Sequence, residues 1–388
     1  MDYGNGNGHW AGGHRQRMLV WNQVDHTQGC GTRRPVHSSG GRGSHKEFSC
    51  RFGGRRCAGC IAQTTMTPTS ISIVIATRNR VAPLRATLET LRGQSLFPRE
   101  VLIVDASDGE ETRELIGSLA PDSPFPLTYT PSLIRSAARQ RNAGADLASG
   151  EVLVFMDDDV LLDQRFLEEL VGPFAADADG RLGGVSGTII NQTYTQPKGV
   201  NRLLLGLCLG NFDACWAGRL MGPAVNFLPR DTPGTVQQVD WLFSTGTAYR
   251  KDVFRRYRFG EQFTGYSFAE DVHLSARVGR DYRLSNTCRA RFEHRDLGQH
   301  THTDWVALGE SMVINRRAIM VDILGRDGLA DAVRLFAYEF LYCGLTMLVQ
   351  ARFRPRQLTK VGLILWGKLR GFVTAWTNHA MPTVRPGY

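Results

Sequence analysis

Hydrophobic and polar positions alternate along the middle of the chain in blocks that are typical of an α/β protein. Three apolar runs, at residues 71–76, 101–104 and 152–156, have the length and continuous hydrophobicity of strands buried on both faces of a sheet. The segments between and after them predict helices over residues 83–94, 110–119, 136–148 and 164–174, with a short strand at residues 127–129. Strands that alternate with helices indicate a doubly wound, mostly parallel sheet over residues 70–175.

After residue 175 the elements become shorter and less regular. The pattern predicts strands at residues 184–191 and 289–292, a strand or turn pair at 239–249, a short helix at 250–256 and a helix at 269–279 that begins with two acids. Residues 197–235 have no clear period and are expected to form a long loop with short helices. We therefore expect one domain over residues 66–325, with halves at 66–175 and 176–325, followed by C-terminal helices over 326–388.

The C-terminal part is both apolar and basic. Residues 335–351 are apolar but contain Glu339, and they are short for a membrane span, which needs about 20 residues. Residues 357–376 are apolar with Lys360, Lys368 and Arg370 interspersed, which is typical of an amphipathic helix at a membrane surface. A core helix would explain the apolar residues but not the complete absence of Asp and Glu from residues 340–388. We expect these helices to anchor the protein on an anionic membrane surface.

The formal net charge of +9 is concentrated at the two ends. Residues 1–65 carry a charge of +6 and residues 340–388 a charge of +7, so the middle of the chain has a charge of −4. This middle part shows no basic stripe with interleaved aromatic side chains, and a nucleic-acid partner is therefore not expected.

Residues 1–65 contain 13 Gly and few large aliphatic side chains, which predicts a disordered leader. They show no secretory signal, and we suspect that the folded protein begins near Met66. Cys57 and Cys60 have the spacing of a zinc knuckle, but no second pair completes it, so a metal site is not expected there. Four further cysteines are expected to be reduced thiols of a cytoplasmic protein: Cys208, Cys215, Cys288 and Cys343.

Removal of residues 1–65 is expected to leave activity and the melting temperature unchanged, because the segment lacks the apolar side chains needed to join a core. Thermal unfolding of the full-length and shortened proteins tests this expectation. A large drop in the melting temperature would show that the leader is part of the fold.

Three consecutive carboxylates, Asp157, Asp158 and Asp159, follow the apolar run at residues 152–156. In an open α/β sheet this end of a strand faces the ligand site. Alternate residues point the same way, so Asp157 and Asp159 can share one ligand. Oxygen ligands suit Mg²⁺ or Mn²⁺. The alternative is an acidic turn that caps the next helix, although three acids are more than a cap needs.

Six short motifs in order carry a family resemblance. They are Ile73-Val-Ile-Ala-Thr-Arg-Asn79, Val101-Leu-Ile-Val-Asp-Ala-Ser107, Ala138-Arg-Gln-Arg-Asn-Ala-Gly144, Phe155-Met-Asp-Asp-Asp159, Ser244-Thr-Gly-Thr-Ala-Tyr-Arg250 and Phe268-Ala-Glu-Asp-Val-His-Leu-Ser-Ala-Arg277. Over residues 70–320 the chain resembles the family 2 inverting glycosyltransferases, which have a Rossmann-like A-type fold and a DxD motif. The resemblance makes residues 66–175 the nucleotide-binding half and residues 176–325 the acceptor half.

The resemblance implies a nucleotide-sugar donor and a divalent metal. Donor-binding roles fall on strand ends and on one helix: Ala76, Thr77, Arg78, Asp105, Arg141, Asn142 and Asp157. Asp159 would bind the metal together with Asp157, and His294 would complete its coordination. Asp158 occupies a position that varies in the family. The alternatives are a helix-surface pair for Arg141 and Asn142 and an ordinary surface histidine for His294.

The resemblance also implies a hydroxyl acceptor and a catalytic base. Asp271 matches the position of the base, and the helix N-terminus is expected to keep its carboxylate ionised. Glu270 and Trp241 would contact the acceptor. The alternatives are a capping acid for Asp271 and core packing for Trp241. Single displacement by a base predicts inversion at the sugar.

Two departures from the family pattern leave specificity open. The second strand ends in Asp105-Ala-Ser-Asp108 in place of the frequent Asp-Asp-Gly-Ser, which makes the nucleotide preference uncertain. Ala269 and His273 stand where family members often have Gly and an acid, so acceptor contacts are expected to differ.

The sequence thus predicts a metal-dependent hexosyl- or deoxyhexosyltransferase in polysaccharide or cell-envelope glycan synthesis. Its acceptor would be a saccharide or a lipid-linked molecule, and its location the inner face of the plasma membrane. The alternatives are a nucleotidyltransferase of similar fold, which the absence of Gly after the first strand disfavours, and a non-catalytic membrane-associated scaffold. A P-loop NTPase is excluded, because the only near match to its phosphate loop, residues 362–369, lacks the final Ser or Thr.

Overall fold

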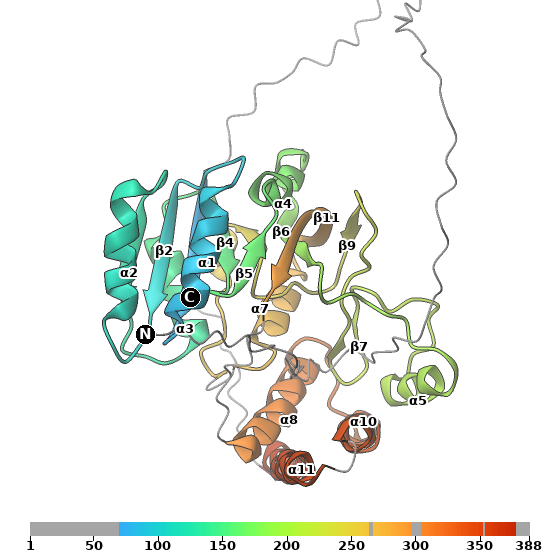
Figure 1. Ribbon diagram of the computed structural model, residues 1–388. Coiled ribbons are helices and arrows are strands. Elements are labelled where there is room, and N and C mark those ends of the chain that lie inside the picture. Colours follow the sequence, from blue (N-terminus) through green and yellow to red (C-terminus); the bar gives the residue numbers. More distant parts are fainter. Residues whose placement is uncertain (1–69, 264–266, 296–303, 352–353, 378–388) are drawn as a thin grey trace, which may run out of the picture. The chain divides into compact units, whose positions relative to one another are not determined.

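The computed structural model describes residues 70–263, 267–295, 304–351 and 354–377 (Figure 1). The expectations for residues 1–65, including the leader and the pair Cys57 and Cys60, lie outside these residues.

Four parallel strands form the first half of a single sheet, in the spatial order β3, β2, β1, β4 (Figure 1). They are β1 (Ile71–Thr77), β2 (Glu100–Asp105), β3 (Leu127–Pro131) and β4 (Val152–Met156). The runs β1, β2 and β4 are apolar on both faces and are almost completely buried, as the sequence predicts. Because these strands are parallel, the residues that follow them meet at one edge of the sheet.

The second half of the sheet is mixed. From β4 it continues through β10 (Thr247–Arg250), β6 (Leu182–Ile189) and β11 (Arg283–His294) to β5 (Val160–Leu162), and β9 (Val236–Gln238) also pairs with β11. β10 is antiparallel to both neighbours, β6 and β11 are parallel, and β5 is antiparallel to β11. The predicted α/β class with a mostly parallel sheet is confirmed, and the antiparallel pairs lie where the sequence pattern becomes irregular.

Over residues 70–175 the helices lie close to their predicted positions. They are α1 (Val81–Arg92), α2 (Glu111–Leu119), the 3-10 turn η1 (Ala120–Asp122), α3 (Ala137–Leu147) and α4 (Phe166–Ala175). The small residues of α3 allow it to approach β1 closely, since a Cβ atom on Gly144 would lie only 2.3 Å from Val74 Cγ1. This close contact fixes the helix that carries Arg141 against the strand end that precedes the candidate site.

Residues 199–278 contain short elements, as expected. These are α5 (Gly199–Leu209), the small hairpin of β7 (Leu220–Met221) and β8 (Val225–Asn226), α6 (Val253–Arg256) and α7 (Glu270–Val278). Positive φ angles at Ser267 (52°) and Ala269 (63°) turn the chain sharply into α7. The turn places Glu270 and Asp271 in the first turn of that helix.

The C-terminal region is helical. It contains α8 (Trp305–Asp322), α9 (Leu329–Phe336), the π-helix η2 (Ala337–Tyr342), α10 (Cys343–Ala351) and α11 (Pro355–Thr377). Helix α8 has no counterpart among the predicted elements, and its buried residues include Asn315, Arg316 and Arg317, which a hydrophobic pattern does not reveal.

Helices α8 and α11 pack tightly on each other through glycines. A Cβ atom on Gly309 would lie 2.2 Å from the Ile364 carbonyl oxygen, and one on Gly367 would lie 2.0 Å from that of Val306. The predicted boundary between residues 325 and 326 therefore separates two helices, α8 and α11, that pack on each other. It also follows that α11 buries one face in the protein, with Val361 and Ile364 inside, and does not present its whole apolar set to a membrane.

A buried ionic group joins three of these helical segments. Arg316 Nε of α8 donates a hydrogen bond to Glu339 Oε1 of η2 at 2.7 Å, and Lys368 Nζ of α11 donates to Glu339 Oε2. All three side chains are at most 6% exposed. A carboxylate in this position needs both cations, because an unpaired buried charge costs several kcal/mol.

Candidate active site

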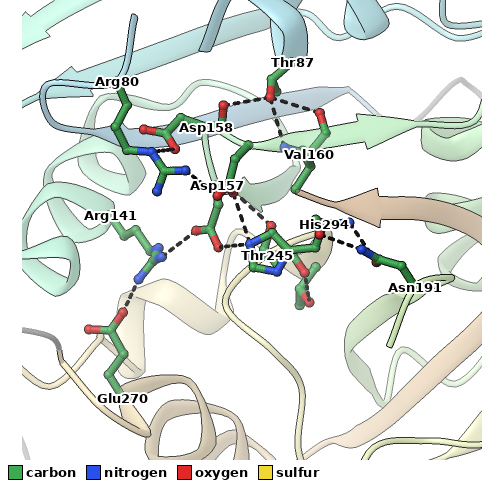
Figure 2. Close-up of polar contacts among 12 residues, drawn as sticks. Arg80, Thr87, Arg141, Asp157, Asp158, Val160, Asn191, Thr245, Glu270 and His294 are labelled. Atoms are coloured by element: carbon green, nitrogen blue, oxygen red, sulfur yellow. Dashed lines mark hydrogen bonds and ion pairs between the residues drawn. The ribbon is translucent and has the colours of Figure 1, made fainter. Parts of the chain in front are cut away.

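Asp157 and Asp158, which follow β4 at the carboxyl edge of the sheet, point their side chains in different directions (Figure 2). Asp157 is held from the neighbouring strand, because its backbone N–H donates to Thr245 Oγ1 at 3.0 Å. Next to Thr245, Gly246 has a φ of +60°, and a Cβ atom there would lie 2.6 Å from the Phe292 ring. The Ser-Thr-Gly segment therefore needs its glycine to bring Thr245 up to Asp157.

Asp157, Asp159 and His294 form a potential metal site. One ligand atom from each lies within 4.8 Å of the others, and His294 Nε2 is 3.1 Å from Asp159 Oδ1 and 3.7 Å from Asp157 Oδ2. The pairing of β11 with β5 brings His294 opposite Val160 and so next to the acids. Two carboxylates and an imidazole are a suitable ligand set for a divalent cation such as Mn²⁺. The structure brings together all three residues that the resemblance assigns to the metal.

His294 is held from its backbone. Asn191 Nδ2 donates to the His294 carbonyl oxygen at 2.7 Å, and the His294 N–H donates to Asn191 Oδ1 at 3.1 Å (Figure 2). The imidazole lies 3.1 Å from Asp159 and 3.7 Å from Asp157, which speaks against an ordinary surface histidine.

Arg80 is a residue of the site that the sequence analysis missed. Its Nη2 lies 2.5 Å from Asp159 Oδ2, and its Nε lies 3.2 Å from Asp158 Oδ1. Burial opposes the charge of Asp159, but His294 and Arg80 outweigh burial and lower the pKa of this carboxyl group. The only signal in the sequence is a basic residue in the turn after β1, and its partners lie far along the chain.

Asp158 belongs to the interior of the protein. It is 4% exposed, and Thr77 Oγ1 donates to its Oδ2 at 2.6 Å. Burial raises the pKa of Asp158 to about 7. Thr87 secures the same turn, since its hydroxyl lies 2.9 Å from the Asp158 carbonyl oxygen (Figure 2). The Thr77 hydroxyl is thus used by Asp158, and the donor-binding role of Thr77 stays a prediction.

Arg141 connects the metal-binding side of the site to α7. It is 5% exposed, its Nη2 donates to Asp157 Oδ1 at 2.8 Å, and its Nη1 contacts Glu270 (Figure 2). Burial opposes its charge, but Glu270 and Asp157 raise its pKa. This placement excludes a helix-surface role for Arg141.

Glu270 is 4% exposed, and burial raises its pKa to about 7. Its ion pair with Arg141 places it inside the site wall, whereas the sequence predicts a contact with the acceptor. The neighbouring Asp271 is partly exposed, and its Oδ1 accepts a hydrogen bond from the Val272 N–H at 2.8 Å.

The pKa of Asp271 is higher than a helix N-terminus alone would give, although the carboxyl group stays mostly ionised at neutral pH. Burial raises its pKa to about 6, in spite of backbone hydrogen bonds and the nearby Arg141, which favour the charged form. Desolvation therefore outweighs the helix N-terminus, which alone would have kept the pKa low. A carboxylate with a raised pKa is a stronger base at neutral pH, and this suits a proton acceptor.

Two residues that are predicted to contact a ligand, Trp241 and Asn142, make hydrogen bonds within the protein. Trp241 is 5% exposed and donates from Nε1 to the Phe227 carbonyl oxygen at 2.9 Å, so it packs in the core and does not present its ring to an acceptor sugar. Asn142 holds the backbone of Phe259 by two hydrogen bonds of 3.0 Å. Both Oδ1 and Nδ2 of Asn142 contact this segment, and its predicted donor-binding role stays a prediction.

Several residues that are predicted to bind the donor lie at the ends of β1 and β2. Asp105 Oδ1 accepts a hydrogen bond from the Ser107 N–H at 2.9 Å, and Tyr129 Oη lies 3.3 Å from Asp105 Oδ2. Arg78 is exposed and lies 3.6 Å from Asp108. Ala76, at the end of β1, is partly buried. These residues share one edge of the sheet, and their donor-binding roles stay predictions.

We expect Arg80→Ala to lower the free energy of unfolding by about 3 kcal/mol at pH 8, because it leaves Asp158 and Asp159 buried without their cation. The loss should be smaller at pH 5, where Asp158 is protonated. Denaturant unfolding at the two pH values measures this. Arg78→Ala is the matched control, since an exposed pair contributes less than about 1 kcal/mol. Equal losses for the two variants would contradict the role of Arg80.

We expect turnover to fall as the pH decreases through about 6, because protonated Asp271 cannot accept the proton of an acceptor hydroxyl. The pH dependence of kcat, measured at saturating donor and acceptor, tests this. A kcat that is constant between pH 5 and pH 8 would contradict the assignment of Asp271 as the base.

Comparison with known proteins supports one family. Residues 72–258 match the family model described as Glycosyl transferase family 2. Validoxylamine A glucosyltransferase of Streptomyces hygroscopicus subsp. limoneus is 32% identical over 223 residues, which are 54% of this chain and 47% of that protein. The uncharacterized glycosyltransferase YwdF of Bacillus subtilis (strain 168) is 34% identical over 100 residues, 26% of this chain and 36% of that protein. The chain thus spans about half the length, or less, of these relatives.

A similar solved structure is the mannosyltransferase PcManGT from Pyrobaculum calidifontis in complex with GDP-Man and Mn²⁺. It has a TM-score of 0.48 and 16% sequence identity, and the match covers 80% of this chain and 88% of that chain.

Proposed function

We propose that this chain, which belongs to glycosyl transferase family 2 through residues 72–258, transfers a sugar from a nucleotide-diphosphate sugar to a hydroxyl group of an acceptor. One observation carries the proposal. The cluster of Asp157, Asp159 and His294 stands beside a separate carboxylate, Asp271, and Arg141 links Asp157 to the residue next to Asp271. The cluster of Asp157, Asp159 and His294 suits a diphosphate with its cation, and Asp271 suits the hydroxyl group of the acceptor.

The residues on the donor side provide binding and charge. Asp157, Asp159 and His294 would hold Mn²⁺ or Mg²⁺, which when bound neutralises the charge that develops on the departing diphosphate. Arg80 holds Asp159 from the opposite side and keeps it ionised. Arg141 fixes Asp157 and is itself fixed by Glu270, so the two sides of the site keep their relative position during the reaction.

Asp271 supplies the base. An acceptor hydroxyl has a pKa of roughly 15 or more, so it must lose its proton as it attacks. The proton passes to the Asp271 carboxylate while the acceptor oxygen bonds to the anomeric carbon and the bond from that carbon to the diphosphate breaks. Because this is a single displacement, the configuration inverts, and an α-linked donor gives a β-linked product.

The loop that presents Asp271 is supported from the C-terminal helices. Asn315 Nδ2 of α8 donates to the Phe268 carbonyl oxygen at 2.9 Å, and the Arg316 guanidinium lies 5.5 Å from the centre of the Phe268 ring. Arg316 is in turn held by Glu339. The helical region therefore contributes to the position of the base and is more than an appended anchor.

A thermal-shift screen with UDP-, GDP- and dTDP-sugars in the presence of Mn²⁺ tests the proposal. A donor at 100 times its dissociation constant should stabilise the protein by roughly 2.7 kcal/mol. The name of the validoxylamine A glucosyltransferase makes a glucosyl donor the first to test. Stabilisation by none of these donors would contradict the proposal.

For the acceptor we propose a saccharide or a lipid-linked molecule of the cell envelope, used at the inner face of the plasma membrane. The support is the apolar, basic C-terminal region, which has no acid over residues 340–388. A non-catalytic scaffold is the competing proposal, and a metal-dependent nucleotide-sugar hydrolysis assay separates the two.

A further inference from the structure

Helix α11 buries a charged side chain and exposes several apolar ones, in addition to the apolar face with Val361 and Ile364 that packs inside. Lys368 is 1% exposed, whereas Trp366 is 56% and Val373 is 54% exposed. Leu363 and Leu369, at 40% each, lie on the same exposed side of the helix. A helix on the surface of a water-soluble protein has the opposite arrangement, with charges outside and apolar residues inside.

The neighbouring helical segments also bury a charged side chain and expose apolar ones. In η2 and α10, Glu339 is 2% exposed while Leu345 and Val349 are 58% and 76% exposed. The exposed apolar residues of α5, α9, η2, α10 and α11 together are called the outer face. They are Val200, Leu203, Leu204, Leu207, Leu329, Val333, Phe336, Leu341, Leu345, Leu348, Val349, Leu363, Trp366, Leu369 and Val373.

Contacts between these helices make the outer face one surface. Helix α5 packs against α9 and η2, and α10 packs against α11. The ring of Phe336 in α9 lies 5.5 Å from that of Phe372 in α11. Exposed apolar side chains gathered on adjoining helices are typical of a surface that meets an apolar partner.

Charge identifies the partner. Residues 340–388 contain seven Lys or Arg and no Asp or Glu; Lys368 is buried, whereas Arg354 and Arg356 are exposed at the start of α11. Apolar side chains together with exposed basic residues complement a bilayer whose headgroups are anionic. A second copy of the chain would present the same basic residues and would be repelled by them.

We propose that the outer face docks on an anionic lipid bilayer, with these helices lying in the boundary between headgroups and acyl chains. Residues 329–349 are long and apolar enough to cross a membrane, with a mean hydropathy of 1.4. Glu339, however, ties the middle of this segment to Arg316 and Lys368 inside the protein. One side of the segment is therefore held by protein, and only the other side meets lipid.

This inference deepens the proposed function and, for its consequence, rests on it: a transferase docked in this way works on an acceptor held in the membrane. A lipid-linked acceptor is then favoured over a free saccharide.

Flotation of the full-length protein with phosphatidylcholine vesicles, with and without phosphatidylglycerol, tests the docking. The test variant carries Leu363→Ser, Trp366→Ser and Val373→Ser. The matched control replaces three exposed apolar residues outside the outer face, Phe97, Leu147 and Val236, by Ser. We expect the wild type and the control to float with the anionic vesicles, and the test variant to lose binding at least tenfold.

Three results would overturn the proposal. The wild type does not float, the test variant floats as well as the control, or the wild type binds neutral and anionic vesicles equally. Sedimentation without lipid adds a fourth, because a dimer that the test variant abolishes would assign the outer face to a second copy of the chain.

The nucleotide-sugar thermal shift, measured on the same variants, separates this inference from the proposed function. We expect an unchanged shift in the test variant, because the outer face takes no part in donor binding. Vesicle binding without any donor-induced shift in the wild type would leave the docking surface intact and remove the proposed function.

Discussion

Asp271→Asn is expected to abolish sugar transfer, to below a tenth of wild-type turnover, while the affinity for the donor stays nearly the same. The amide has the shape of the carboxylate but cannot accept the acceptor proton. The charge of Asp271 is needed in the chemical step, whereas the proposed donor contacts are made by Asp157, Asp159 and His294. Turnover and donor affinity, measured separately, show both effects.

Glu270→Gln is a suitable comparison, because it changes the neighbouring carboxylate without removing the proposed base. It should weaken the contact with Arg141 and lower turnover less than Asp271→Asn does. If Asp271→Asn retains more than a tenth of the turnover, Asp271 is not the base.

Asp159→Ala is expected to remove the dependence of donor binding on Mn²⁺. Without this carboxylate the metal site loses the ligand that His294 approaches most closely, at 3.1 Å. The diphosphate would then face Asp157 without a cation between them. Calorimetric titration of the donor with and without Mn²⁺ measures the change.

Asp158→Asn is the matched control for this measurement, since Asp158 contacts Thr77 and Arg80 and lies outside the metal cluster. It should keep the Mn²⁺ dependence of binding. Unchanged Mn²⁺-dependent affinity in Asp159→Ala, or equal losses in both variants, would refute the assignment of the metal ligands.

The strands and the acids that follow them could be predicted because both depend on short stretches of sequence. The apolar run of β4 is buried wherever it lies in the sheet, and the topology of an α/β sheet directs its end to the ligand side. The role of His294 at the metal is predicted from the family resemblance alone. The structure supplies the reason for it, since β11 pairs with β5 and brings His294 to the acids.

The features that could not be predicted depend on contacts between distant parts of the chain. Arg80 pairs with Asp159, which lies 79 residues further along the chain, and no local pattern marks that pair. The sequence does not distinguish core packing from acceptor contact for Trp241, and its hydrogen bond to Phe227 shows that it packs in the core.

Ionisation was equally hidden from the sequence. The helix N-terminus at Asp271 is visible in the sequence and favours the ionised carboxylate, but the burial that raises its pKa to about 6 is not visible there. Helix α8 was missed for a related reason, because its buried face carries Arg316 and Arg317, which the pattern presents as surface residues.

The release of nucleoside diphosphate from a nucleotide sugar, followed with and without Mn²⁺, is the measurement that tests the central claim most directly. Wild-type protein should release it only with the metal, and neither Asp159→Ala nor Asp271→Asn should do so at more than a tenth of that rate. No release from UDP-, GDP- or dTDP-sugars, or formation of pyrophosphate from a nucleoside triphosphate and a sugar phosphate in its place, would contradict the claim that this site is a glycosyltransferase active site.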